Sequence, residues 1–271
     1  MGERSLRTRL GKGLLQAPGA YDALGAKVIE AAGFEAVYMT GYGTAAAAGL
    51  PDLGLLTMTD MVRNAERIAR AVGVPVIADA DTGYGNEDNV ARTVEEYERA
   101  GVAAIHIEDQ AWPKKCGHMA DKRVVAKDEM VTKVKAAVAA RSSEDFLIIA
   151  RCDAVAVEGF EAALDRARAY GEAGADVLFV EAPETEEQVA AIPERLPQWP
   201  QVINLAPRTP DLSADRLAEL GYAIAIYPGL CFVAALEAYE HAVRTLKETG
   251  AQQDLALWRT RFEEINRFLG A

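Results

Sequence analysis

The chain has 271 residues, half of them hydrophobic and 26% charged, a length that fits one large domain or two modest ones. Acidic side chains outnumber basic ones by 41 to 29, and this net charge of −12 argues against a nucleic-acid or anionic-membrane surface, which needs clustered cations. Three cysteines, no apolar signal core at the N-terminus and no apolar run long enough to span a bilayer predict a cytoplasmic protein without disulfides.

Short apolar runs recur along the chain. In four places, beginning at Ala31, Arg99, Glu172 and Glu219, a helical pattern ends at a glycine and an apolar run then ends at a polar residue. Glycine ends a helix at little cost, and apolar runs with little alternation are typical of strands buried on both faces of a parallel sheet. The predicted strands are Leu14–Ala17, Ala36–Thr40, Pro75–Asp81, Ala103–Asp109, Phe146–Asp153, Asp176–Glu181, Gln201–Leu205 and Ala223–Tyr227.

Amphipathic stretches such as Asp60–Ala71 alternate with these strands, and no linker or low-complexity segment interrupts them. The alternation predicts an α/β fold, a single (β/α)₈ TIM barrel domain over residues 1–271. A doubly wound open sheet is the alternative, but no Gly-x-Gly-x-x-Gly turn follows the first strand.

Two extra helices are predicted after the last strand, Leu230–Thr249 and Ala256–Leu269. The second carries an apolar stripe made of Trp258, Phe262, Ile265 and Leu269. The stripe could cover the barrel's own surface, or it could pack on a neighbouring subunit because eight helices already close the barrel. The sequence pattern leaves both arrangements open.

Polar side chains end most of the predicted strands. Asp79 and Asp81 lie two residues apart, so both are expected to project to the same side of their strand. The carboxyl ends of barrel strands meet at one mouth, which would also receive Glu108, Arg151, Asp153, Glu181 and Asn204. Carboxylates gathered there would repel one another without a cation, and oxygen ligands favour Mg²⁺ or Mn²⁺ over zinc. The set predicts a divalent metal site, although any one of these acids alone could be a helix cap or a salt-bridge partner.

The connection after the fourth strand, from Asp109 to about Val124, is long for a loop between a strand and a helix. A segment of this length at a barrel mouth predicts a lid. Its Cys116 is flanked by Lys114, Lys115 and His118, whose charges are expected to lower the pKa of the thiol. The thiol could be a nucleophile, a zinc ligand or a proton donor, and donation to a carbanion agrees best with a magnesium-type cluster.

Motifs over nearly the whole chain resemble those of the isocitrate lyase / phosphoenolpyruvate mutase superfamily. The most specific is Lys114-Lys115-Cys116-Gly117-His118, preceded by Ile107-Glu108-Asp109-Gln110; the others lie at residues 38–43, 49–54, 78–85, 150–154 and 179–182. With this cysteine the loop is similar to the lyase branch, which includes 2-methylisocitrate lyase, dimethylmalate lyase and the petal death protein. The resemblance implies a homotetramer, a dimer of dimers, whose subunits exchange the helices of residues 230–271.

The resemblance also implies roles for individual residues. Asp79 and Asp81 would hold Mg²⁺ directly or through water, with Glu108 and Asp52 in support. Cys116 would close over the site together with His118 and protonate the departing carbanion. Either Tyr38 or a metal-bound water would act as the base. The substrate, a dicarboxylate or an α-keto acid, would be bound by Thr40, Gly41, Tyr42, Gly117, Arg151, Glu181 and Asn204.

Three departures from the family pattern bear on the substrate. The run from Asn204 to Pro210 lacks the glutamate of many family lyases, and Tyr227–Val233 lacks the arginine of tricarboxylate-cleaving members. A third carboxylate would be buried unpaired, at a cost on the order of several kcal/mol, which argues against isocitrate and methylisocitrate. Tyr42 is bulkier than the usual small residue and is expected to shrink or reshape the pocket.

These observations predict a Mg²⁺-dependent carbon–carbon lyase or hydrolase. It would cleave the C2–C3 bond of a 2-hydroxy or 2-oxo dicarboxylate, of the substituted malate or oxaloacetate type, to an α-keto acid or oxalate plus a carboxylic acid. Two alternatives stay open. One is phosphoenolpyruvate or carboxyphosphonoenolpyruvate mutase, or phosphonopyruvate hydrolase, activity on the same scaffold. The other is a catalytically silent barrel that binds a keto acid.

Overall fold

The computed structural model describes residues 5–119, 121–252 and 257–270. The chain divides into two compact parts, Met1–Cys231 and Phe232–Ala271. Ala256, where the last helix is predicted to begin, and the side chain of Trp258 lie outside the described residues.

The first part is a closed barrel of parallel strands in the order β1 to β8, which confirms the predicted fold and excludes an open sheet. β1 pairs with β2 and, closing the barrel, with β8, from Leu15↔Ile224 to Pro18↔Tyr227. The strands are β1 (Leu15–Ala20), β2 (Val37–Met39), β3 (Val76–Asp79), β4 (Ala104–Glu108), β5 (Leu147–Cys152), β6 (Val177–Val180), β7 (Gln201–Asn204) and β8 (Ile224–Tyr227).

Each predicted strand coincides with an observed one, and only the ends of β1 and β3 differ from the prediction by more than one residue. β1 continues to Ala20 because Pro18 and Gly19, a pair more typical of a turn, both pair with neighbouring strands. β3 ends at Asp79, two residues before its predicted end, because Asp79 Oδ1 accepts a hydrogen bond of 2.9 Å from the Asp81 N–H. Asp81 has a φ of 48° and therefore lies in the turn that follows β3.

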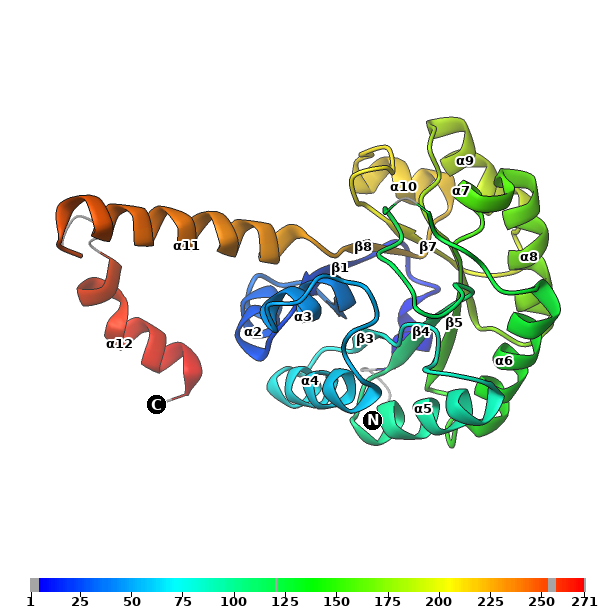
Figure 1. The fold of residues 1–271 in the computed structure, drawn as a ribbon, viewed down its shortest axis with the longest axis horizontal. Helices are drawn as coiled ribbons and strands as arrows, with labels where there is room; N and C mark the ends of the chain where they lie inside the picture. Colours follow the sequence, from blue (N-terminus) through cyan, green and yellow to red (C-terminus); the bar gives the residue numbers. More distant parts are fainter. Residues whose placement is uncertain (1–4, 120, 253–256, 271) are drawn as a thin grey trace. The chain divides into compact units, whose positions relative to one another are not determined.

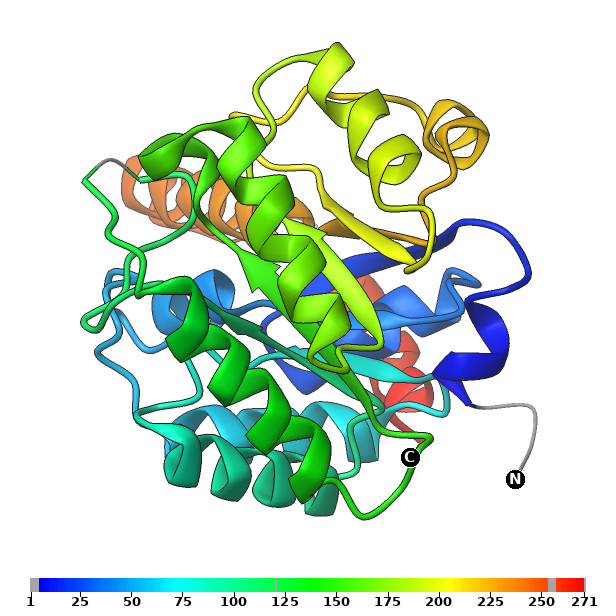
Figure 2. The same ribbon diagram turned by 90° about the vertical axis from the view of Figure 1, so that its right-hand side faces the viewer.

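Helices enclose the strands (Figure 1), and α4, α5, α6 and α8 pack side by side along the outside of the barrel (Figure 2). α4 and α5 each begin at a capping box, in which Thr57 and Asp60, or Asn86 and Asn89, exchange hydrogen bonds. The helices of this part are α1 (Leu6–Arg9), α2 (Ala23–Ala31), α3 (Gly41–Ala47), α4 (Met58–Ala71), α5 (Glu87–Arg99), α6 (Lys127–Ala140), α7 (Val155–Glu158), α8 (Phe160–Glu172), α9 (Glu186–Arg195) and α10 (Ala214–Leu220).

The buried apolar side chains form two groups. One, which includes Ile107 and Ile148, lies between the strands and the helices; the other, which includes Ile149 and Phe179, fills the barrel interior. Because side chains alternate along a strand, the residue two positions after an interior residue also faces inward. Interior residues such as Ile149 are therefore followed, two positions later, by polar residues such as Arg151 at the barrel mouth.

α1 closes the amino end of the barrel. Leu6 is fully buried with the interior group. Arg7 Nη2 donates to Asp176 Oδ1 at 2.7 Å and to Glu144 O at 2.5 Å, which ties α1 to the segments just before β6 and β5. The site at the other end is thus built on a barrel whose floor is sealed by side chains.

The second part contains α11 (Leu230–Thr249), which begins just before it, and α12 (Leu257–Leu269), at the predicted positions. No side chain of α11 is buried, and large apolar residues are exposed along it: Leu230, Val233, Leu236, Tyr239, Val243 and Leu246. Phe262, Ile265 and Leu269, the described members of the predicted stripe, are exposed as well. Among the described residues, no helix combines the length and the apolar character needed to cross a membrane.

Leu6 plugs the amino end of the barrel, and replacing it is expected to destabilise the fold. Leu6→Ala leaves a cavity beneath the interior group and should lower the free energy of unfolding by about 2–5 kcal/mol, measured by chemical denaturation. Leu24→Ala, at a side chain that is 52% exposed, is the matched control and should cost less than about 1 kcal/mol. Equal losses in the two variants would contradict the assigned plug.

Candidate active site

Polar side chains surround the carboxyl end of the barrel. They come from the ends of successive strands and are all buried: Thr40, Asp79, Glu108, Arg151, Glu181 and Asn204. Below them the barrel interior is closely packed by buried side chains that include Tyr38, His106, Ile149 and Phe179. The predicted convergence of these residues on one mouth follows directly from the alternation of side chains along the strands.

Arg151 is the central cation of this site. Its Nε donates to Asp153 Oδ2 at 2.8 Å and its Nη2 to Asp153 Oδ1 at 3.1 Å. The guanidinium also lies 3.4 Å from Glu108 Oε2 and 3.7 Å from Glu181 Oε1. Burial alone would raise the pKa of Glu181, but Arg151 and His118 outweigh this effect and hold that pKa below its ordinary value. A guanidinium fixed along one edge is suited to binding a substrate carboxylate.

The acids predicted to hold a metal are buried and have few hydrogen-bond donors around their oxygens. Among the described residues, Glu108 Oε1 is buried and accepts no hydrogen bond, and Asp81 Oδ1 is paired with Lys114 Nζ at 2.7 Å. Burial, opposed by Lys114 and aided by Asp79, raises the pKa of Asp81 to about 6, and burial raises the pKa of Glu108 well above its ordinary value. A divalent cation would stabilise the charged form of such oxygens, so the donor set fits Mg²⁺.

Lys114 supplies a cation to this set from the lid. Its buried Nζ lies 2.5 Å from Asp52 Oδ1 and 2.7 Å from Asp81 Oδ1. Within the part of the chain that the structure describes, no group of three His, Cys, Asp or Glu side chains is arranged to hold a metal ion. Two of the predicted metal-binding acids, Asp52 and Asp81, are instead neutralised by Lys114 in this structure.

The predicted lid, from Asp109 to about Val124, lies in the connection between β4 and α6, and its described residues lie over the mouth. Its two ends pair, since the Ala111 N–H donates to Arg123 O at 2.8 Å and the Val125 N–H to Asp109 O at 2.9 Å. At the tip, a Cβ on Gly117 would lie 2.2 Å from Arg151 Nη2 and 2.6 Å from Glu181 Oε1. Only glycine allows the lid backbone to come this close to the site.

His118 joins the lid to the opposite wall. Its Nδ1 accepts the backbone N–H of Arg208 at 3.2 Å, so its Nε2 carries the proton and donates to Glu181 Oε1 at 2.9 Å. Asn204 Nδ2 donates to both oxygens of Glu181, at 3.0 and 3.3 Å. The structure therefore brings together three residues that were predicted from the sequence to share one site.

The predicted environment of Cys116 is wrong in one respect. Burial raises the pKa of the thiol to about 11, whereas flanking cations were expected to lower it. The reason is geometric, because the Lys114 ammonium turns away from the thiol toward Asp52 and Asp81. The thiol is therefore protonated at neutral pH, which suits a proton donor and argues against a resting thiolate nucleophile.

Tyr38 forms a buried pair with a residue that the sequence did not assign to the site. Its hydroxyl lies 2.8 Å from His106 Nε2, and that nitrogen is 3.7 Å from Asp79 Oδ1. Burial lowers the pKa of His106 to about 4, and burial together with Asp79 raises the pKa of Tyr38 well above its ordinary value. Both side chains are therefore neutral at pH 7.

The start of α3 forms another edge of the mouth. Thr40 Oγ1 caps this helix by accepting the Gly43 N–H at 3.2 Å. A Cβ on Gly41 would lie 2.3 Å from Asp79 Oδ2, so glycine permits the backbone to approach this acid. Tyr42 is 43% exposed, and its effect on the shape of the pocket stays a prediction.

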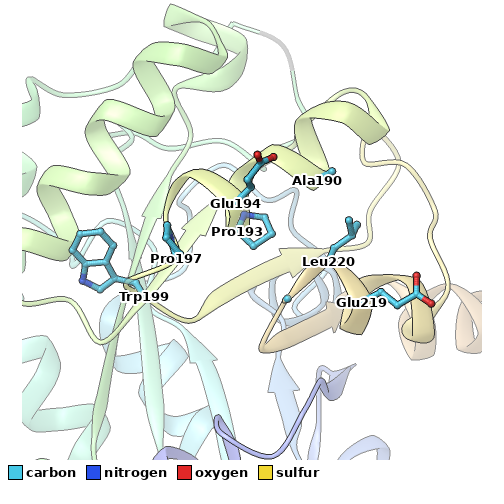
Figure 3. Close-up of a pocket in the computed structure, with 8 residues that line it drawn as sticks. Ala190, Pro193, Glu194, Pro197, Trp199, Glu219 and Leu220 are labelled. Atoms are coloured by element: carbon cyan, nitrogen blue, oxygen red, sulfur yellow. The ribbon is translucent and has the colours of Figure 1, made fainter.

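A larger surface hollow lies elsewhere (Figure 3). Its lining includes Pro193 and Glu194 of α9, Trp199 just before β7 and Glu219 near the end of α10. These residues are at the amino ends of the strands, opposite the polar mouth. The hollow contains none of the predicted site residues and is not the candidate active site.

A closed parallel barrel with buried acids, a fixed arginine and a thiol-bearing lid at its carboxyl end defines a barrel enzyme. A family model described as phosphoenolpyruvate phosphomutase matches residues 5–247. The chain belongs to this family, which confirms the resemblance found in its motifs.

The chain is also similar in sequence or in fold to proteins whose reactions are named. The chain is 50% identical over 262 residues to 2,3-dimethylmalate lyase of Eubacterium barkeri, covering 96% of this chain and 90% of that protein. The solved structure of oxaloacetate acetylhydrolase with 3,3-difluorooxalacetate has a TM-score of 0.89 and 39% identity, covering 92% of this chain and 87% of that one. Phosphonopyruvate hydrolase, solved with oxalate and Mg²⁺, has a TM-score of 0.90 and 33% identity, covering 98% of this chain and 94% of that one.

The reactivity of Cys116 should depend on pH in a characteristic way. Because burial disfavours the thiolate, alkylation of Cys116 by iodoacetamide should be roughly two orders of magnitude slower at pH 8 than that of a free cysteine. Its rate should still be rising about tenfold per pH unit between pH 8 and 10. Peptide mapping by mass spectrometry separates this thiol from Cys152 and Cys231. A rate that levels off near pH 8 would contradict the raised pKa.

Proposed function

We propose that the protein is a Mg²⁺-dependent enzyme that cleaves the C2–C3 bond of a 2-hydroxy or 2-oxo dicarboxylate. The observation that carries this proposal is the closed lid, in which Gly117, the residue after Cys116, lies against Arg151 and Glu181 among the buried acids of the mouth. Cleavage of a dicarboxylate to a carbanion needs a proton donor, a cation for the substrate carboxylate and acids for a metal ion. The protonated Cys116 thiol, the Arg151 guanidinium and the buried acids of the mouth could supply these three functions. The relatives named as dimethylmalate lyase and oxaloacetate acetylhydrolase support substituted malates and oxaloacetate as substrates.

Asp79, Asp81, Glu108 and Asp52 would hold the metal ion. When bound, the ion supplies Lewis-acid stabilisation to the C1 carboxylate and C2 oxygen of the substrate. For the acids to turn toward it, the Lys114 ammonium must leave Asp81 or share it. Arg151 binds a substrate carboxylate, and Thr40 and Gly41 line the side where α3 begins, with Tyr42 beside them.

In the lyase reaction the C2 hydroxyl loses its proton and becomes a carbonyl as the C2–C3 bond breaks. The electron pair of that bond stays on C3, where the adjacent carboxylate delocalises it. Cys116 Sγ donates its proton to C3, which leaves an α-keto acid and a carboxylic acid. With oxaloacetate, water first adds to the C2 carbonyl, and the same bond cleavage then gives oxalate and acetate.

Tyr38 is our candidate for the base that accepts the C2 hydroxyl proton. It is itself protonated at neutral pH, so it can accept a proton only while passing its own to His106 Nε2, 2.8 Å away. Asp79, 3.7 Å from that nitrogen, would stabilise the imidazolium that results. Gly117 and His118 exclude water while the carbanion exists.

A substrate panel tests the proposed function. Substituted malates, citramalate, oxaloacetate, methylisocitrate and phosphonopyruvate are incubated with Mg²⁺ or with EDTA, and the products are identified by NMR. We expect turnover of a dicarboxylate that EDTA abolishes, and poor turnover of methylisocitrate, because no cation follows β8 in the run Tyr227–Val233. Cys116→Ala should lower kcat by about 10²–10⁴-fold. Turnover of phosphonopyruvate alone would replace this proposal with phosphorus chemistry, and wild-type rates in Cys116→Ala would refute the role of the thiol.

We also propose that α11 and α12 pack on neighbouring subunits of a homotetramer. Apolar side chains exposed along both helices support this, because a lone chain would leave them in water. Sedimentation equilibrium should give four times the monomer mass, and Leu236→Glu with Val243→Glu should shift the protein to smaller species. A wild-type monomer would overturn this proposal.

A further inference from the structure

We propose that Gln110, Lys122 and Asp153 form a polar clamp that positions the thiol of Cys116 by holding the backbone on both sides of it. Gln110 and Lys122 are positioning residues, since neither needs to touch the substrate. The proposal rests on the proposed function, because it gives the clamp a purpose only if Cys116 donates a proton.

Lys122 holds the residue after the thiol. Its Nζ donates to Gly117 O at 2.5 Å and to Asp153 Oδ1 at 3.1 Å. The side chain is almost fully buried, with 2% of its surface exposed, which is rare for a lysine unless it is paired. A buried ammonium that donates to a backbone carbonyl fixes that carbonyl strongly, because the bond is charge-assisted and shielded from water.

Gln110 holds the residue before the thiol. Its Oε1 accepts the Lys115 N–H at 3.0 Å, and its Nε2 donates to Lys115 O at 2.8 Å. The same Nε2 donates to Asp153 Oδ1 at 3.2 Å. One amide thus binds both backbone groups of the residue next to Cys116, and Gln110 itself is buried.

Asp153 joins both halves of the clamp to the substrate-binding cation. The carboxylate that accepts from Lys122 and Gln110 also accepts two hydrogen bonds from Arg151. Burial alone would raise the pKa of Asp153, but Arg151 and Lys122 outweigh it and keep the acid charged. The same carboxylate therefore holds both the backbone beside Cys116 and the guanidinium of Arg151. With the lid closed, this shared partner fixes the distance between the thiol and Arg151.

Substitution of the two positioning residues tests this clamp. Lys122→Met and Gln110→Met keep the length of each side chain and remove its hydrogen bonds. Lys127→Met and Gln188→Met make the same changes at residues of α6 and α9 outside the lid and serve as matched controls. For every variant the measurements are the thermal unfolding midpoint, the rate of Cys116 alkylation without substrate, and kcat and KM.

In both lid variants we expect Cys116 alkylation at pH 8 to become about tenfold faster or more, because a charge-assisted or doubly hydrogen-bonded contact is lost. We expect kcat to fall by about tenfold or more with KM changed less than about threefold, since the step that needs the thiol is affected and Arg151 keeps Asp153. The control variants should match the wild type in both measurements.

Unchanged alkylation rates in both lid variants, with unfolding midpoints equal to the wild type, would overturn the clamp. So would a rise in KM with kcat unchanged, because the network would then serve binding alone. If Lys122→Met fails to fold, Gln110→Met decides the question. Alkylation is measured without substrate, so the clamp can be tested even if the substrate panel refutes the proposed reaction.

Discussion

The site depends on burying several carboxylates together at the carboxyl end of the barrel. Carboxylates removed from water stay ionised only beside cations or hydrogen-bond donors. Arg151 stabilises Glu181, Glu108 and Asp153, and Lys114 reaches Asp81 and Asp52 from the lid. Even so, one buried oxygen of Glu108 accepts no hydrogen bond from any described residue. A divalent ion bound here would neutralise carboxylate charge that Arg151 and Lys114 leave uncompensated.

The same charge holds the lid closed. Lys114 and Lys122 of the lid form ion pairs with Asp52 and Asp153, and His118 donates a hydrogen bond to Glu181. In this arrangement the two lid lysines thus neutralise part of the buried negative charge. Closure also buries Cys116, and burial keeps its thiol protonated. A buried, protonated thiol suits the proton donation that we propose better than it suits attack as a nucleophile.

Much of the fold and the site could be predicted from the sequence. Glycines after helical patterns, followed by apolar runs, place the strands to within a few residues, and the alternation of side chains along a strand gathers the acids and Arg151 at one mouth. The error at Cys116 arises because neighbours in sequence are not neighbours in space, since the long Lys114 side chain points elsewhere. Gln110 and Lys122 were missed because nothing local distinguishes a buried glutamine or lysine from an exposed one.

The sequence by itself determined the barrel, the end at which its chemistry lies and the residue types available there, because these follow from short-range periodicity. Only the tertiary structure decided which cation meets which acid and how the lid is held. Lys114 pairs with an acid 62 positions away and Lys122 with one 31 positions away. Such pairing depends on distance and on exclusion of water, and both exist only once the barrel has closed.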